Sequence, residues 1–374
     1  MSNIDHIFLY VILYVSMITS DIVIRNKIDR KYQPLVLLFP ILLYIIVEGC
    51  RYGRGVDYFG YGSRYIMGID VGQPIFDWLN GVFRSFDPFT LKPYGLCFIF
   101  YAMVFISCLL FLYTKEFRYN TKFILFFACL STLHITEWTI RQGVSFSFFL
   151  PALYCLNSKK IIPFATLCLI VLLIHYGNFI LIVVVLFSYF ILNKRPIPIG
   201  LSIPAILLSM YVLSNGAMLP YVESMISSLN LSALGGNFQG YVDNSEMWFS
   251  ENAMTDEWTR GAFTQLLTCM FYIGLFVVGY YYHSKKTSYV YIYNASVIGI
   301  IFNEMFHLVG SLARAFAPIA SLWFIPLSLF LYHRKIIAKR KLCNVALLLV
   351  FMYLILYYGR YVFMNPSANY VWNL

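Results

Sequence analysis

Nine basic residues stand apart from the clusters that hold most of the lysines, and eight of them are arginine. The nine are Arg51, Arg54, Arg64, Arg84, Lys92, Arg141, Arg260, Arg314 and Arg360. A guanidinium presents a planar fork of N–H donors that binds a phosphate or a carboxylate through two hydrogen bonds. The bias towards arginine therefore indicates a site for an oxyanion. The alternative is chance combined with anchoring of arginines at a membrane interface.

Two of these arginines lie in the segment Arg51-Tyr-Gly-Arg54-Gly-Val-Asp57-Tyr58-Phe-Gly-Tyr61. Its glycines favour turns and a close approach of the backbone to a ligand. We predict that Arg51 and Arg54 clamp the oxyanion, that Asp57 orients an arginine or acts on a hydroxyl, and that Tyr58 and Tyr61 stack on sugar rings. The segment lacks the lysine of a Walker loop, and its glycine pattern alone has little specificity.

Three side chains are candidates for proton transfer, namely Asp57, Glu137 and His175. His175 is the first choice because the reference pKa of histidine lies near neutrality. Each has a structural alternative. Glu137 is four residues before Arg141, which is the spacing of an ion pair on one helix face. His175 is equally consistent with a hydrogen-bonded histidine at a helix end.

A further polar group near the C-terminal end comprises Glu304, His307 and Arg314. Arg314 lies inside an apolar run and needs a partner there, because an unpaired charge in hydrocarbon is costly. Glu304 and His307 are predicted either to pair with it structurally or to join it in binding substrate.

The elements that hold these residues are membrane helices. The chain has 374 residues, of which 60% are hydrophobic and only 12% charged, and its mean hydropathy is +0.72. A span needs about 20 mostly apolar residues. We predict a single membrane domain over 1–374, all-α and polytopic, with about 12 transmembrane helices. They are placed at 7–24, 34–50, 94–114, 122–140, 139–157, 161–176, 177–193, 199–215, 262–282, 289–308, 311–331 and 342–360. The first is expected to be a true span, because no basic segment precedes it.

Eighteen of the 27 basic residues fall in alternate loops of this topology. The positive-inside rule makes that side cytoplasmic, so both termini are predicted to face outwards. From Lys122 to Arg141 a helix rises about 29 Å, which places Glu137 and Arg141 near the outer boundary. From Lys160 to His175 the rise is only about 22 Å, so His175 is expected below the outer surface.

Two outer loops are predicted, at 51–93 and 216–261. The first contains a segment, 74–87, whose apolar residues follow helical spacing, and we expect it to lie in the membrane interface. The second is rich in acidic and aromatic residues, which suits either carbohydrate binding or a solvated lid. Six of the 8 cysteines fall inside apolar runs, and no CxxC pair exists, so neither a disulfide framework nor a metal site is expected. Cys50 and Cys97 flank the first outer loop, and their pairing is a minor alternative.

The sequence resembles the EpsG family of Wzy-like bacterial polysaccharide polymerases. The resemblance rests on the segment from Arg51 to Tyr61, on Arg141-Gln142-Gly143 followed by two lysines, and on His175-Tyr176. It covers most of the chain in order and spacing. It implies a GT-C-like, metal-independent glycosyltransferase without a cofactor. Such an enzyme joins repeat units carried on undecaprenyl diphosphate, at the outer face of the bacterial cytoplasmic (inner) membrane.

With that resemblance, Arg51, Arg54, Arg141 and Arg314 are predicted to bind the donor diphosphate and to stabilise the charge that grows on the leaving group. Gln142, Tyr176, Glu304 and His307 join Tyr58 and Tyr61 as expected substrate contacts. A flippase and a chain-length regulator of the same pathway are possible partners, and nucleic acid is not. The alternatives are a transporter of lipid-linked oligosaccharides, for which repeats and midplane charges would be expected, and an outer-face glycan ligase.

Overall fold

The computed structural model describes residues 3–26, 28–55, 57–86, 92–211, 221, 224, 228, 260–286, 288–336, 340–360 and 369–370. Almost all of the predicted outer loop at 216–261 lies outside these residues. The chain divides into two compact units: unit 1 comprises Met1–Phe179 and Leu354–Leu374, and unit 2 comprises Ile180–Tyr353. The single membrane domain stays a prediction.

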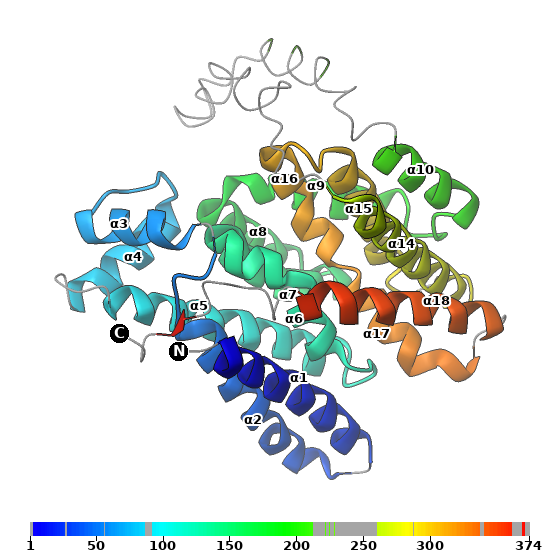
Figure 1. Ribbon diagram of the computed structural model, residues 1–374, viewed down its shortest axis with the longest axis horizontal. Coiled ribbons are helices and arrows are strands. Elements are labelled where there is room, and N and C mark those ends of the chain that lie inside the picture. Colours follow the sequence, from blue (N-terminus) through cyan, green and yellow to red (C-terminus); the bar gives the residue numbers. More distant parts are fainter. Residues whose placement is uncertain are drawn as a thin grey trace. The chain divides into compact units, whose positions relative to one another are not determined.

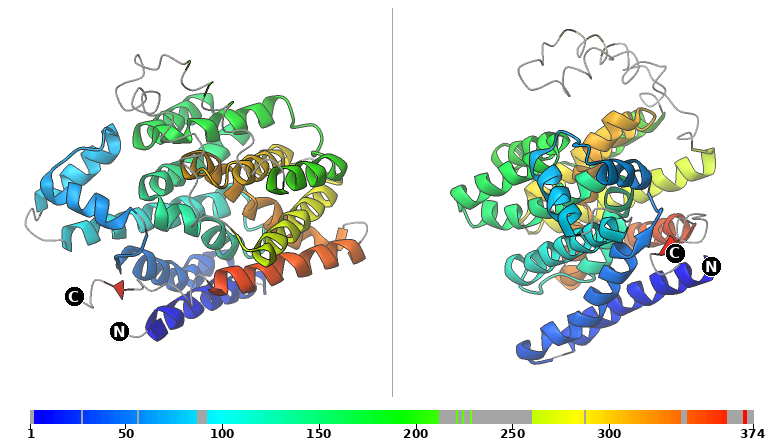
Figure 2. Two further views of the ribbon diagram at one scale, coloured as in Figure 1. Left: turned by 45° about the horizontal axis from the view of Figure 1, so that its top comes forward. Right: turned by 90° about the vertical axis from the view of Figure 1, so that its left-hand side faces the viewer.

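Unit 1 holds most of the predicted site residues (Figures 1 and 2). Its helices are α1 Asn3–Arg25, η1 Arg30–Tyr32, α2 Gln33–Tyr44, η2 Ile45–Gly49, α3 Tyr58–Met67, α4 Pro74–Phe86, α5 Lys92–Phe111, η3 Leu112–Glu116, α6 Ile124–Trp138, α7 Ile140–Asn157, α8 Ile161–Ile174, η4 Tyr176–Asn178 and η10 Leu354–Tyr358. Its two short strands, β1 Arg51–Tyr52 and β2 Asn369–Tyr370, pair antiparallel, with Arg51 opposite Tyr370.

Unit 2 is also helical. Its elements are α9 Phe179–Phe190, which begins at the unit boundary, α10 Ile199–Tyr211, α14 Ala262–His283, α15 Val290–Met305, α16 Gly310–Ser321, α17 Phe324–His333, η9 Arg334–Ile336 and α18 Arg340–Tyr353. Within it, α15 packs against α16, and α14 packs against α18.

Helices occupy the described part of every segment predicted as a span. Among the described residues, five helices are long and apolar enough to cross a membrane: His6–Arg25, Gly95–Glu116, Ala262–His283, Leu312–His333 and Lys341–Tyr358. Five shorter helices are also apolar, such as Gln33–Gly49 and Ile161–Ile174. The structure therefore confirms an all-α membrane protein, whereas the number of spans and the GT-C-like architecture stay predictions.

Helix α4 confirms the helix expected at 74–87. Two of its polar side chains, however, form hydrogen bonds within the protein. Asp77 accepts hydrogen bonds from the backbone N–H groups of Val71 and Gln73, at 3.0 and 2.7 Å. Asn80 accepts one from Tyr101 at 2.9 Å. The exposed stripe consists of apolar residues one turn apart, Trp78, Val82 and Phe86. Its location in the membrane interface stays a prediction.

The pairing of Cys50 with Cys97 is wrong. Both cysteines are free, and Cys97 is fully buried in the core formed by α3, α4, α5 and α7.

Candidate active site

A widened helical turn places an acidic side chain inside unit 1. The π-turn η2 ends the second predicted span and carries Glu48, which is 5% exposed. The next residue, Gly49, lies so close to α5 that a Cβ would be 2.7 Å from the Cα of Ile99. Only glycine permits this approach of η2 and α5, because a real Cβ essentially never comes within 3.0 Å of another heavy atom. Glu48 is thus held inside the helix cluster.

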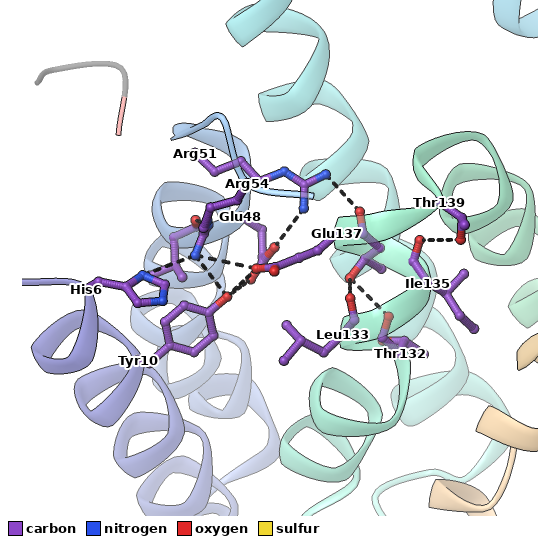
Figure 3. A network of polar contacts seen from close by, with 12 residues as sticks. His6, Tyr10, Glu48, Arg51, Arg54, Thr132, Leu133, Ile135, Glu137 and Thr139 are labelled. Atoms are coloured by element: carbon purple, nitrogen blue, oxygen red, sulfur yellow. Dashed lines mark hydrogen bonds and ion pairs between the residues drawn. The ribbon is translucent and has the colours of Figure 1, made fainter. Parts of the chain in front are cut away.

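Arg54 is the centre of a buried polar network (Figure 3). Its side chain is 0% exposed, and one nitrogen of the guanidinium donates to the backbone carbonyl of Val47. The other terminal nitrogen lies 3.4 Å from Glu137 and 3.1 Å from the hydroxyl of Tyr10. The same nitrogen is 3.3 Å from Nδ1 of His6. Because a guanidinium only donates, Nδ1 of His6 must accept, so His6 is neutral with its proton on Nε2.

Tyr10 joins the two buried glutamates. Its hydroxyl oxygen lies 2.6 Å from a carboxylate oxygen of Glu48 and 2.6 Å from one of Glu137. The three residues come from α1, η2 and α6 (Figure 3). The network therefore ties together three helices that are far apart in the sequence.

Arg51 lies beside this network, on strand β1. It donates to the backbone carbonyl of Thr136 at 2.8 Å and lies 3.5 Å from Glu48. Its guanidinium carbon is 4.7 Å from the centre of the Phe98 ring. With 2% exposure, Arg51 fixes the end of α6 in this structure rather than facing an open cleft.

A sharp break separates α6 from α7 at Thr139, whose φ and ψ are −124° and 72°. Gly143 makes the turn possible, since a Cβ there would be 3.0 Å from the carbonyl oxygen of Ile135. Gln142 is buried and contacts Thr139 at 3.1 Å and Asn178 at 3.4 Å. In the sequence Arg141-Gln142-Gly143, the last two residues thus build the turn.

Arg141 lies at the start of α7 and contacts an aromatic ring. It is half-buried, and its guanidinium carbon lies 4.9 Å from the centre of the Tyr61 ring. In the described part of the chain no carboxylate pairs with Arg141. The ion pair between Glu137 and Arg141 is therefore wrong, and Glu137 pairs with Arg54 instead. The break at Thr139 is the reason, because it interrupts the helix on which the spacing depends.

His175 completes this second cluster. It lies in the turn between the apolar helices α8, which ends at Ile174, and η4, which begins at Tyr176. His175 lies close enough to Arg141 to be influenced by its charge. Its Nδ1 is buried without a hydrogen-bond partner among the described residues. Gly177 leaves room for the ring, since a Cβ would be 2.8 Å from its Nε2.

We name Tyr61, Arg141 and His175 the outer cluster. Asp57 lies close enough to influence the pKa of Tyr61, which burial raises to about 12. Tyr176 donates its backbone N–H to Gln73 at 3.3 Å. Tyr58, by contrast, is 1% exposed and stacks on Phe98 in the core. Tyr58, Gln142 and Arg54 therefore have structural contacts here, and their roles towards substrate stay predictions.

In unit 2, the predicted site residue Glu304 forms an ion pair and a hydrogen bond. Glu304 is 1% exposed and receives both terminal nitrogens of Arg260, at 2.6 and 3.3 Å. Tyr272 donates to it at 3.0 Å. The ion pair of Glu304 is thus with Arg260, 44 positions away, and not with Arg314 as the structural alternative supposed. Arg314 lies on α16 of the same unit.

Sequence reasoning missed three residues of these networks: His6, Tyr10 and Glu48. Arg260 was among the nine separate basic residues, but its pairing with Glu304 was not predicted. Glu48 carried a usable signal, because it is an acidic residue at the end of an apolar run. His6 and Tyr10 carried none, since a histidine and a tyrosine near the start of a span are also typical interface residues.

Buried charges held in networks on apolar helices define a polytopic helical membrane protein. The profile of the EpsG family matches residues 34–373. The chain belongs to this family, which confirms the resemblance found in the sequence. No curated protein and no solved structure matches the chain. EpsG membership makes it a polysaccharide polymerase-like membrane protein, and α1, with His6 and Tyr10, precedes the matched region.

Proposed function

We propose that the protein is a membrane glycosyltransferase that polymerises polyprenyl-diphosphate-linked oligosaccharide repeat units at the outer face of the bacterial cytoplasmic membrane. Its family supports the class of activity. The observation that carries the choice of site is the outer cluster: a half-buried guanidinium, without a carboxylate partner in the described residues, near an imidazole and a tyrosine ring.

In this proposal Arg141 binds the diphosphate of the donor. A phosphate oxygen accepts from the guanidinium fork, and the charge of Arg141 stabilises the negative charge on the leaving diphosphate. The face of the Tyr61 ring contacts the Arg141 guanidinium. The edge of the same ring is proposed to contact a sugar ring of the substrate. Arg51 and Arg54 hold the polypeptide of unit 1 in place. A role of Arg314 of unit 2 in binding diphosphate stays a prediction from the sequence.

The reaction transfers a glycosyl group to a sugar hydroxyl. The hydroxyl oxygen of the acceptor attacks the anomeric carbon of the donor, and the bond between that carbon and the diphosphate oxygen breaks. The electron pair leaves with the polyprenyl diphosphate. The hydroxyl proton passes to a base, for which His175 is the first candidate and Asp57 the second.

Metal independence belongs to the same proposal, with arginines in the place of a metal ion. In the described residues no three His, Cys, Asp or Glu side chains gather where they could hold a metal. Undecaprenyl diphosphate as the carrier, and a flippase and a chain-length regulator as partners, follow from the family resemblance.

The test is reconstitution of the purified protein with a lipid-linked repeat unit, with the length of the product chains as readout. Arg141→Ala is expected to lower the rate by about 100-fold or more while leaving the melting temperature unchanged. Arg64→Ala is the matched control, because Arg64 is an exposed arginine of unit 1, in the predicted outer loop 51–93.

Products that contain one transferred unit only would instead support a ligase. Polymer of normal length and amount from Arg141→Ala would exclude Arg141 from the site.

A further inference from the structure

The buried network cannot satisfy its contacts with both glutamates ionised. The Tyr10 hydroxyl has one proton to donate, yet it lies 2.6 Å from a carboxylate oxygen of Glu48 and 2.6 Å from one of Glu137. It also accepts from Arg54 at 3.1 Å. Two oxygens at 2.6 Å with no hydrogen between them repel each other. One of the two carboxyl groups must therefore carry a proton and donate it to Tyr10.

The surroundings of the two arginines decide which carboxyl holds the proton. Arg54 is 0% exposed and lies 3.4 Å from Glu137. Arg51 lies 3.5 Å from Glu48, and both border a cavity with room for water. Because a guanidinium that water does not reach needs an anionic neighbour more than one beside such a cavity, Glu137 is the anion.

We infer that Glu48 is a protonated, neutral residue of the folded protein, which donates to Tyr10, while Tyr10 donates to ionised Glu137. The network then contains two positive charges and one negative charge. His6 adds none, because its Nδ1 accepts from Arg54. The other titratable groups that influence Glu48 or its neighbours are Tyr14, Tyr44 and Cys129, and none carries a formal charge at neutral pH.

The net positive charge lies beside a cavity of about 30 Å³, which is bordered by Glu48, Arg51, Thr136 and Ser147. This volume accommodates about one or two water molecules. A water molecule bound there would give Glu48 a partner for proton exchange. Glu48 is thus a positioning residue: its proton joins η2 to α1 through Tyr10, and its neutrality leaves a net positive charge at Arg51, at the base of the first outer loop.

Infrared spectroscopy of the purified wild-type protein at neutral pH tests the inference without any substrate. A carbonyl band of a protonated carboxyl group is expected, and it should disappear in Glu48→Gln. Glu116→Gln is the matched control and should keep the band, because Glu116 accepts a hydrogen bond from Asn157 elsewhere in unit 1. This test does not depend on the proposed function, so its failure would leave that proposal standing.

Stability gives a second readout. Glu48→Gln retains a donor for Tyr10, so its Tm should remain close to that of the wild type. Glu137→Gln removes the anion of Arg54 and should lower the Tm by about 5 °C or more. A wild-type spectrum without the band would overturn the inference. So would a band that persists in Glu48→Gln, or a loss of stability in Glu48→Gln with none in Glu137→Gln.

Discussion

Unit 1 contains two sets of polar residues that differ in how their arginines are satisfied. In the buried network, Arg54 has a carboxylate, a hydroxyl and a carbonyl as neighbours and no exposed surface. In the outer cluster, Arg141 lies on an aromatic ring and keeps part of its surface exposed. The comparison teaches that the arginines of one unit divide into those that hold the fold and those that can accept a ligand.

The largest effect is expected where the buried network is broken. Arg54→Ala leaves Glu137 as a buried carboxylate without its ion pair and should cost about 3–5 kcal/mol of unfolding free energy. The measurement is thermal denaturation in detergent, followed by size-exclusion chromatography. Arg64→Ala serves as the control, and equal melting temperatures for both variants would contradict the structural role of Arg54.

A smaller effect is expected at the turn that separates the two sets of residues. Gly143→Ala brings a Cβ to 3.0 Å from the Ile135 carbonyl oxygen and should destabilise by about 1–3 kcal/mol. Because the turn carries Arg141, polymer yield should fall as well. Gly60→Ala is the control, since nothing lies within 4 Å of the Cβ that it would add. A Gly143→Ala protein of wild-type stability and activity would show that the turn tolerates a side chain.

The smallest effect concerns the aromatic partner of Arg141. Tyr61→Leu removes the cation–π contact, worth about 0.5–1 kcal/mol at a partly exposed site. The apparent KM for the lipid-linked donor should rise about two- to fivefold, whereas Tyr61→Phe should behave like the wild type. A similar rise in Tyr61→Phe would assign the effect to the hydroxyl instead.

The sequence was sufficient for the helices, because the length of an apolar run depends on local composition. The level of Glu137, Arg141 and His175 in the membrane stays a prediction. The sequence was insufficient for the partners. The spacing of Glu137 and Arg141 suggested a pair, but the break at Thr139 depends on Gly143 packing against the preceding turn. Arg260 and Glu304 meet across 44 positions, and no local pattern signals such a contact.

The pairing of β1 with β2 constrains the path of the chain through the bilayer. Arg51 and Tyr370 are opposite each other in one ladder, so both strands lie on the same side of the membrane. The polypeptide from Tyr52 to Asn369 must then cross an even number of times. The ten crossings predicted between these residues obey this parity, whereas any revised topology that adds or removes a single crossing there would separate the strands by the thickness of the hydrocarbon.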